Sequence, residues 1–491
     1  MNAPRGVDLP AANRRASAAF AAILRDTAEQ FPALGPAIGR LDRKQLGDSL
    51  VRFEALRACL PAPKRVDAAE SLVQAAAGHM VYADGDGRET PLPDYMSGIA
   101  SPLRLTTKTC GAGGALKPKI VRGGATSTGA EIVRLAESMA ARHELSRPAV
   151  DALAWIARQG AIDLSGEKFV VMGAAAEIAP TELLLEAGAT VLFVDVQDGA
   201  AWAAARGIGN GTLVFVPGGA DLVSQPREIA ATIAAFAGGS PVHVGAFAYR
   251  GGQNMEWRLA AAMNAIVRAL GPGIVASVAM AVSPTSPAQA SAEDAAEAAR
   301  RLAQPSVADR FWRAIGVQRP SHHEQGGEAW PRTVVGMQGT SYLAAQYFEK
   351  RLAAEIYGTR GPRPGERRPV RVSANVAGIT RTGSMDIPLF QAGFVGASAL
   401  GVQSYAAETT RALSGLVYLE NLLNPASIAA PAAAHADENE HARRLHATQI
   451  HGGLFAYPYA IDATMVRAGL IGLAKNPALI PGVVRSIVRG K

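Results

Sequence analysis

The feature that most constrains the fold of this chain is a regular alternation of short apolar runs with alanine-rich stretches, beginning near Ser165. The apolar runs have the length of strands, and the stretches between them carry apolar residues at helical spacing. We predict strands at 168–172, 190–194, 212–216, 242–247, 274–282 and 370–375, and helices at 179–187, 226–236, 257–270 and 341–357. Strands that alternate with helices form a parallel sheet with helices on both faces. The sequence therefore predicts an α/β protein with a doubly wound, Rossmann-like sheet.

The flanks of this alternation are different in character. We predict three regions: a mainly helical N-terminal domain at 1–165, the sheet domain at 166–385, and a helical C-terminal region at 386–491. This division agrees with a prior of about 150 residues per domain. A polar, proline-rich stretch at 284–331 is longer than an ordinary connection, so it predicts an insertion near one edge of the sheet.

Composition excludes several classes of protein. Hydrophobic residues make up 48% of the 491 residues, so the chain can form a sizeable core and is not disordered. Two cysteines are too few for a disulfide framework, which predicts a reducing, cytoplasmic environment. The sequence contains no run of about 18 strongly apolar residues, so we expect no membrane span. His441, His446 and His451 are five residues apart and do not share one helix face, so we predict solvated histidines and no metal site.

The net charge of +7 is concentrated in two segments. Residues 101–130 hold five cations and several glycines but no acid. Such a segment can bind the phosphate of a coenzyme A or carrier-protein arm. The alternative is a basic loop that binds no ligand. The segment lacks aromatics for base stacking, so we expect no nucleic-acid partner. Residues 463–491 hold five cations and no acid among apolar residues. That pattern is typical of peripheral contact with a membrane, of docking on the protein itself, or of a subunit interface in a homo-oligomer.

The first strand–helix unit has the parts of a dinucleotide site. A turn of small residues, beginning with Gly173 and Ala174, follows the strand, and the next strand ends in Asp195. Small residues let backbone amides approach a pyrophosphate. An acid at the end of the second strand accepts hydrogen bonds from ribose hydroxyls and repels a 2′-phosphate, so Asp195 favours NAD(H) over NADP(H). Glu177 stands where a later glycine is common, and the alternative is a nucleotide-free unit.

Together with a later motif, this unit resembles the short-chain dehydrogenase/reductase superfamily. Residues 369–385 read PVRVSANVAGITRTGSM, similar to the family's sixth strand and following loop. The AGITRT within them resembles the AGPIRT loop of enoyl-acyl-carrier-protein reductases. The resemblance implies that Gly378 and Ile379 lie against the nicotinamide and that Thr382 reaches the phosphates. Ile178 resembles the family residue that follows the glycine turn, so it joins the implied cofactor site.

The resemblance also implies a tyrosine that donates a proton and a lysine on the same helix that lowers the tyrosine pKa. Tyr342 and Lys350 are eight residues apart and differ by about 80° around an α-helix, so they lie loosely on one face. Tyr347 is a second tyrosine near Lys350. The usual lysine position relative to Tyr342 is occupied by Gln346. The alternative is that these aromatic side chains only pack the helix.

Two strand ends supply the remaining candidates. Ser283 follows the predicted fifth strand at its carboxyl end, where ligands meet a doubly wound sheet, and is the candidate catalytic serine. The fourth strand runs into GAFAYRGG, so we expect Phe247 and Tyr249 to line the cofactor cleft. Tyr249 is an alternative proton donor.

These expectations combine into an enzyme hypothesis. The chain would be an NAD(H)-dependent oxidoreductase that moves a hydride to or from a carbon at or near a carbonyl of an apolar substrate, such as an enoyl or acyl-thioester compound. The lack of the usual tyrosine–lysine spacing favours a second hypothesis, a scaffold or regulatory protein with the same fold. A third is a lyase or isomerase that uses the same sheet.

Overall fold

The computed structural model describes residues 6–39, 45–111, 114–383, 388–431 and 444–488. Its centre is a seven-stranded sheet in the order β14-β11-β10-β7-β8-β9-β4. The strands are β4 (Thr106–Thr109), β7 (Lys168–Met172), β8 (Thr190–Val194), β9 (Thr212–Phe215), β10 (Val242–Ala246), β11 (Val275–Met280) and β14 (Arg371–Ser373). Six of them are parallel, and β4 pairs antiparallel with β9. Numbered along the chain, the parallel strands follow the order 3-2-1-4-5-6, which is compatible with a Rossmann-like fold.

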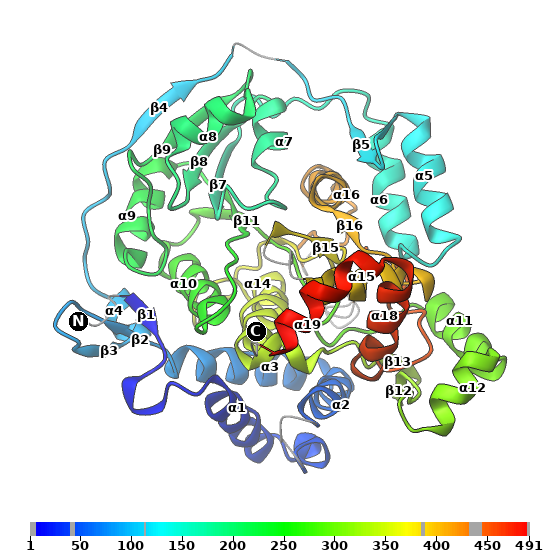
Figure 1. Ribbon diagram of the computed structural model, residues 1–491. Coiled ribbons are helices and arrows are strands. Elements are labelled where there is room, and N and C mark those ends of the chain that lie inside the picture. The colour runs from blue at the N-terminus through cyan, green and yellow to red at the C-terminus, as the bar shows by residue number, and fades with distance from the viewer. Residues whose placement is uncertain (1–5, 40–44, 112–113, 384–387, 432–443, 489–491) are drawn as a thin grey trace.

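Helices cover both faces of the sheet (Figure 1). Side chains alternate along each strand, so Val170 and Phe169 belong to two different hydrophobic clusters. One cluster includes residues of α1 (Ala16–Gln30), α2 (Leu46–Ala58), α3 (Ala62–Gly78), α9 (Pro226–Ala237), α10 (Met255–Ala269), α13 (Gly339–Gln346) and α14 (Ala353–Thr359). The other includes residues of α5 (Ala130–Ala140), α6 (Arg147–Ala157), α7 (Thr181–Glu186), α8 (Gly199–Arg206) and α16 (Ala407–Leu423).

Smaller elements surround this core. A three-stranded sheet consists of β1 (Gly6–Asp8), β2 (Val81–Ala83) and β3 (Glu89–Pro91), followed by α4 (Leu92–Met96). Three short strand pairs are β5 (Lys119–Arg122) with β6 (Ala125–Thr128), β12 (His322–Gln325) with β13 (Glu328–Pro331), and β15 (Thr380–Arg381) with β16 (Tyr405–Ala406). The remaining helices of eight residues or more are α11 (Ala292–Ala303), α12 (Val307–Ala314), α15 (Pro388–Ala399), α18 (Ile461–Lys475) and α19 (Ile480–Val488).

The parallel strands lie where the alternation predicts them, within about three residues at each end. The sequence missed β4, because an edge strand of the sequence TTKT has polar, mostly exposed side chains and no apolar alternation. β4 precedes residue 165, so the sheet extends across the predicted domain boundary there. The predicted insertion contains α11, α12 and the β12–β13 pair. In the described part of the chain, no helix combines the length and apolar character needed to cross a bilayer.

Candidate active site

The candidate site lies at the carboxyl ends of β7 and β10, where the strand order reverses. Gly173 follows β7 with a φ of +78°, and a Cβ there would overlap the backbone of Ala248. The amides of Phe247 and Ala248 donate hydrogen bonds to the carbonyl of Met172 at 2.8 and 3.0 Å. Glycine is therefore required at 173, both for the backbone conformation and for the close contact between the ends of the two strands.

Asp195 lies at the end of β8 and accepts hydrogen bonds from two backbone amides. Ala175 donates at 3.0 Å and Gln197 at 3.1 Å, each to a different carboxylate oxygen. The acid thus holds the turn after β7 against the end of β8. Ala174 is buried in that turn. Each Asp195 oxygen keeps a second lone pair, so ribose hydroxyls can still donate to it.

Glu177 bridges this turn to the loop that contains Thr382. The amide of Gly383 donates to Glu177 Oε1 at 3.2 Å, and Arg411 donates to the Glu177 carbonyl at 3.1 Å. A pyrophosphate running from the turn toward Thr382 would meet this negative charge. The Glu177 carboxylate therefore opposes phosphate binding in the conformation described.

A cavity of about 160 Å³ lies beside the carboxyl ends of β11 and β14. It collects most of the residues predicted from the sequence. Its lining includes Ile178, Phe247, Tyr249, Ser283, Tyr342, Lys350, Gly378, Ile379 and Thr382. Gly173, Ala174 and Asp195 are not part of its lining; they lie at the ends of β7 and β8.

Tyr342 and Lys350 are brought into this cavity by an irregular helix. The predicted offset of about 80° assumed a continuous α-helix, but Tyr347–Leu352 form a π-helical turn between α13 and α14. A π-helical turn contains one residue more than an α-helical turn. Without that extra residue the pair is seven α-helical steps apart, an offset of about 20°. The irregularity therefore places the two side chains nearly on one face.

The side chain of Ser283 is held by a chain of polar groups. Thr285 Oγ1 donates to Gln338 Oε1 at 2.7 Å, so Ser283 Oγ donates in turn to Thr285 at 2.8 Å. The amide of Ser283 donates to Gln346 Oε1 at 3.0 Å. Gln346 therefore positions the serine rather than replacing the lysine, a role that its place in the sequence does not reveal.

The two tyrosines of the cavity contact each other edge-on, with ring centroids 6.2 Å apart. Burial raises the pKa of Tyr342, while Ser283, Thr285 and Gln338 lower it. Burial, with Tyr342 and Glu256 nearby, raises the pKa of Tyr249 to about 12. Both phenols therefore carry their proton at neutral pH, as a proton donor must.

Lys350 is buried and has one hydrogen bond to the main chain. Its Nζ donates to the carbonyl of Ala281 at 3.0 Å. Burial lowers the pKa of Lys350 to about 8. The lysine is thus a cation at neutral pH that can lose its charge in mildly basic solution.

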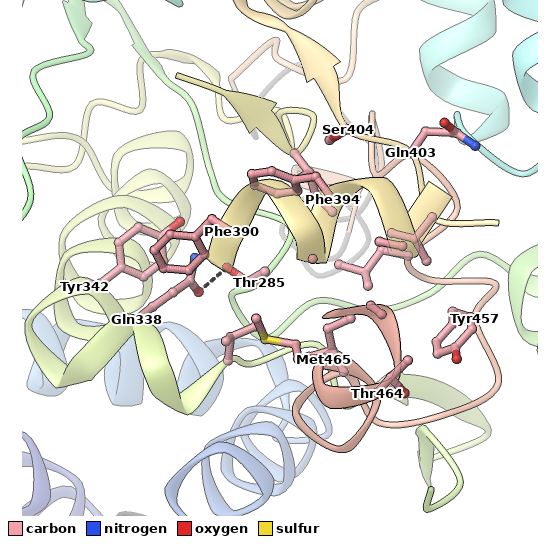
Figure 2. Close-up of a pocket in the computed structure, with 18 of the residues that line it drawn as sticks. Thr285, Gln338, Tyr342, Phe390, Phe394, Gln403, Ser404, Tyr457, Thr464 and Met465 are labelled. Atoms are coloured by element: carbon pink, nitrogen blue, oxygen red, sulfur yellow. Dashed lines mark hydrogen bonds between the residues drawn. The ribbon is translucent and has the colours of Figure 1, made fainter. Parts of the chain in front are cut away.

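An apolar chamber of about 390 Å³ adjoins the cavity and shares Tyr249, Tyr342 and Ile379 with it. Figure 2 shows Phe390 of α15 beside Tyr342 and Met465 of α18 below it. Other apolar walls come from Phe394, Ala397, Leu400, Val402, Leu454, Ile461 and Ala468. The C-terminal region therefore closes the chamber.

The histidines differ from expectation. His446 and His451 are buried, not solvated, because each has a polar partner in the interior. The imidazole of His446 donates to the Ala374 carbonyl at 2.9 Å, and burial, with Arg351 nearby, lowers its pKa to about 3. His451 lies 3.1 Å from Asp294. His441 is outside the described residues, and within them no group of three or more histidine, cysteine or acidic side chains is arranged for a metal.

The described residues of the basic segment, 101–111 and 114–130, line neither the cavity nor the chamber. Two of its cations have acidic partners: Arg122 pairs with Glu144 at 2.9 Å and Lys119 with Glu186 at 3.7 Å. A phosphate bound by this segment would lie outside the candidate site.

Comparison with known proteins does not place the chain in a family. No family model matches it, and no curated protein is significantly similar in sequence. The cavity and its residues are therefore the basis for the function proposed next.

Proposed function

We propose that the chain is an NAD(H)-dependent oxidoreductase of the short-chain dehydrogenase/reductase type that acts on an apolar carbonyl or enoyl substrate. One observation carries the proposal: Ser283, Tyr342 and Lys350 line one cavity at the carboxyl end of a sheet with dinucleotide-fold strand order. The adjoining apolar chamber has the size and lining of a site for an aliphatic group.

The cofactor, when bound, supplies or accepts the hydride. In the reducing direction, the Tyr342 hydroxyl donates its proton to the substrate oxygen as that oxygen gains negative charge. Ser283 orients the same oxygen when its hydroxyl hydrogen turns from Thr285 to the substrate, while its backbone amide stays bonded to Gln346 at the end of β11. The Lys350 cation stabilises the phenolate that this proton transfer leaves, because an opposite charge nearby favours the ionised form. Tyr249 is the alternative donor, since it lies edge-on to Tyr342.

The residues fit a dinucleotide at its two ends. Asp195 retains acceptor capacity for a ribose at one end, and Gly378, Ile379 and Phe247 line the cavity at the other. The uncompensated charge of an acid at the ribose favours NAD(H) over NADP(H). Between these ends, the Glu177 carboxylate must turn away from Gly383 before phosphates are accommodated.

An NADH titration followed by fluorescence tests the cofactor. We expect saturable binding that Gly173→Ala weakens at least about tenfold, because the added Cβ overlaps Ala248. Gly160→Ala is a matched control: its φ of +71° gives a similar backbone strain, but no atom lies within 4 Å of its Cβ position. Equal binding by both variants would contradict the dinucleotide site.

Oxidation of NADH with a panel of medium-chain ketones, 3-oxoacyl thioesters and 2-enoyl thioesters tests the reaction. We expect Tyr342→Phe to retain NADH binding and to lose about 10²- to 10⁴-fold in turnover. If Tyr249→Phe has that effect instead, Tyr249 is the donor.

The position of Glu177 favours a second candidate, a non-catalytic scaffold with the same fold. A carboxylate placed across the turn suits a protein that binds no pyrophosphate. In that case NADH binding and turnover would both be absent, and a lyase or isomerase would show turnover without net change in NADH.

A further inference from the structure

Three helices of the C-terminal region carry an apolar surface on their outer side. α15 and α18 pack backbone to backbone, because a Cβ on Gly396 would overlap Ala468 and one on Gly472 would overlap Ala392. α19 packs beside α15, and all three helices lie together in Figure 1. The inner side of α15 and α18 closes the chamber through Phe390, Phe394 and Met465, among others. The two faces of one thin layer therefore have separate roles.

The outer side exposes large aliphatic groups at helical spacing. Val466 and Leu470 stand one turn apart on α18 with 61% and 52% of their surface exposed. Ile480 and Val484 stand one turn apart on α19, 45% and 53% exposed, and Val395 of α15 is exposed as well. We call these five residues the outer apolar surface. Water contact with such a group of side chains is unfavourable, which indicates that something covers them.

The charge on these helices is mainly positive. α15 contains no charged residue, and the acid of α18 and α19 is Asp462 at the start of α18, which accepts the amide hydrogen of Gly336 at 3.0 Å. Lys475 at the end of α18 and Arg485 of α19 are exposed. Arg467 does not contribute, because it is mostly buried and pairs with Asp309. An apolar face on helices with more cations than acids complements an anionic lipid surface.

We propose that α15, α18 and α19 dock this protein on an anionic membrane surface through the outer apolar surface. The helices lie in the interface and do not cross it. Val466, Leu470, Ile480 and Val484 enter the boundary between headgroups and acyl chains, while Lys475 and Arg485 contact the headgroups. Docking places the helices that cover the chamber against lipid, the phase in which an apolar substrate is concentrated. That last step rests on the proposed function, whereas docking itself does not.

Flotation of the whole protein with vesicles tests the proposal. We expect binding to vesicles of phosphatidylcholine mixed with phosphatidylglycerol, weak binding to phosphatidylcholine alone, and release by salt. The double variant Val466→Glu/Leu470→Glu should bind at least about tenfold more weakly, because it inserts charge into the apolar contact. Ile480→Glu/Val484→Glu tests the other helix, so the result does not depend on one variant folding. Ile99→Glu is the control, since Ile99 is 98% exposed but lies far along the chain in another region.

Three outcomes overturn the proposal: no binding by the unaltered protein, equal binding to both kinds of vesicle, or equal binding by all variants. Light scattering without lipid identifies the main rival. If the unaltered protein is a dimer that Val466→Glu/Leu470→Glu converts to monomers, a second copy covers the surface. NADH titration of the same samples separates the two proposals, because vesicle binding does not require a cofactor.

Discussion

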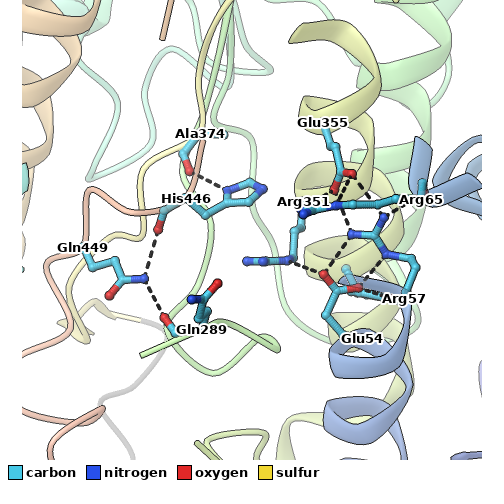
Figure 3. A network of polar contacts seen from close by, with 10 residues as sticks. Glu54, Arg57, Arg65, Gln289, Arg351, Glu355, Ala374, His446 and Gln449 are labelled. Atoms are coloured by element: carbon cyan, nitrogen blue, oxygen red, sulfur yellow. Dashed lines mark hydrogen bonds and ion pairs between the residues drawn. The ribbon is translucent and has the colours of Figure 1, made fainter. Parts of the chain in front are cut away.

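Two faces of one helical segment, Gly339–Thr359, are both buried but differ in how their charged side chains are balanced. One face carries Tyr342 and Lys350 into the candidate cavity. The other carries Arg351 and Glu355 toward α2 and α3 of the N-terminal region (Figure 3). Tyr347 lies on this face too, because its hydroxyl donates to Glu54 of α2. Both faces are buried and polar, but their charges are balanced in different ways.

On the face toward the N-terminal helices, every acid has several cationic partners. Glu355 accepts hydrogen bonds from Arg57 at 2.7 Å and Arg65 at 2.8 Å. Glu54 accepts from Arg57 at 2.7 Å, from Arg351 at 3.3 Å and from the Tyr347 hydroxyl. Burial would raise the pKa of Glu54, yet Arg57 and Arg351 together lower it to about 2. The network ties α2 and α3 to the π-helical turn.

On the face toward the cavity, Lys350 is buried with a carbonyl oxygen but no acid as its recorded hydrogen-bond partner. The ion pairs on one side fix the segment, and the charge on its other side has no acid to balance it. A buried charge of that kind is costly for stability and typical of functional sites.

The largest effect is expected for Glu355→Ala. The substitution leaves Arg57 and Arg65 buried without their acid, which costs about 3–5 kcal/mol of the free energy of unfolding. Chemical denaturation measures it. Glu137→Ala is the control, because its pair with Arg147 is solvent-exposed and its loss should leave the unfolding midpoint unchanged. A small effect of Glu355→Ala would show that the network is dispensable.

Low pH should reduce the stability that the ion network on this face contributes. The folded pKa of Glu54 is about 2, below the ordinary value of 4.5, so the unfolded chain binds more protons between those limits. The contribution of Glu54 is therefore complete above pH 4.5 and is lost as the pH falls toward 2, by about 3 kcal/mol. Denaturation curves at stepped pH test this. Glu54→Gln should flatten the dependence, and an unchanged slope would assign acid sensitivity to other groups.

On the cavity face, the charge of the buried side chain should lower the free energy of unfolding, whereas the charge of Glu54 raises it. The folded pKa of Lys350 is about 8 and its ordinary value 10.5, so the buried cation costs about 3 kcal/mol at neutral pH. Lys350→Met removes that cost but also the bond to Ala281, worth about 1–2 kcal/mol. We expect a net gain in stability of about 1–2 kcal/mol together with loss of turnover. The gain should vanish as the pH rises from 8 to 10.5, where the unaltered lysine becomes neutral.

A lower stability of Lys350→Met at neutral pH would contradict this balance and make Lys350 a structural residue. Loss of turnover without a change in NADH binding would separate its effect on Tyr342 from contact with the cofactor. Calorimetry at two pH values and the turnover assay together distinguish these outcomes.

The central strands could be predicted because parallel strands buried on both faces appear as continuous apolar runs, as at 168–172 and 190–194. The candidate cavity could be predicted in part, since Ser283 and Tyr342 follow from family resemblance and strand position. The ion network could not, because Glu54 and Glu355 are about 300 residues apart and nothing local links them. The π-helical turn was equally hidden, since no proline or glycine marks Tyr347–Leu352.

The smallest effect is expected for Gln346→Met, which tests how finely the segment positions the cavity. Gln346 stands one α-helical turn from Tyr342, and its Oε1 accepts the amide hydrogen of Ser283 at 3.0 Å. Methionine fills a similar volume but cannot accept that bond, so stability should fall by only about 1 kcal/mol. The carboxyl end of β11 would then hold Ser283 less firmly, and kcat should fall while KM and NADH affinity change little. A rise in KM with kcat unchanged would mean that Ser283 binds the substrate in its ground state without acting in the transition state.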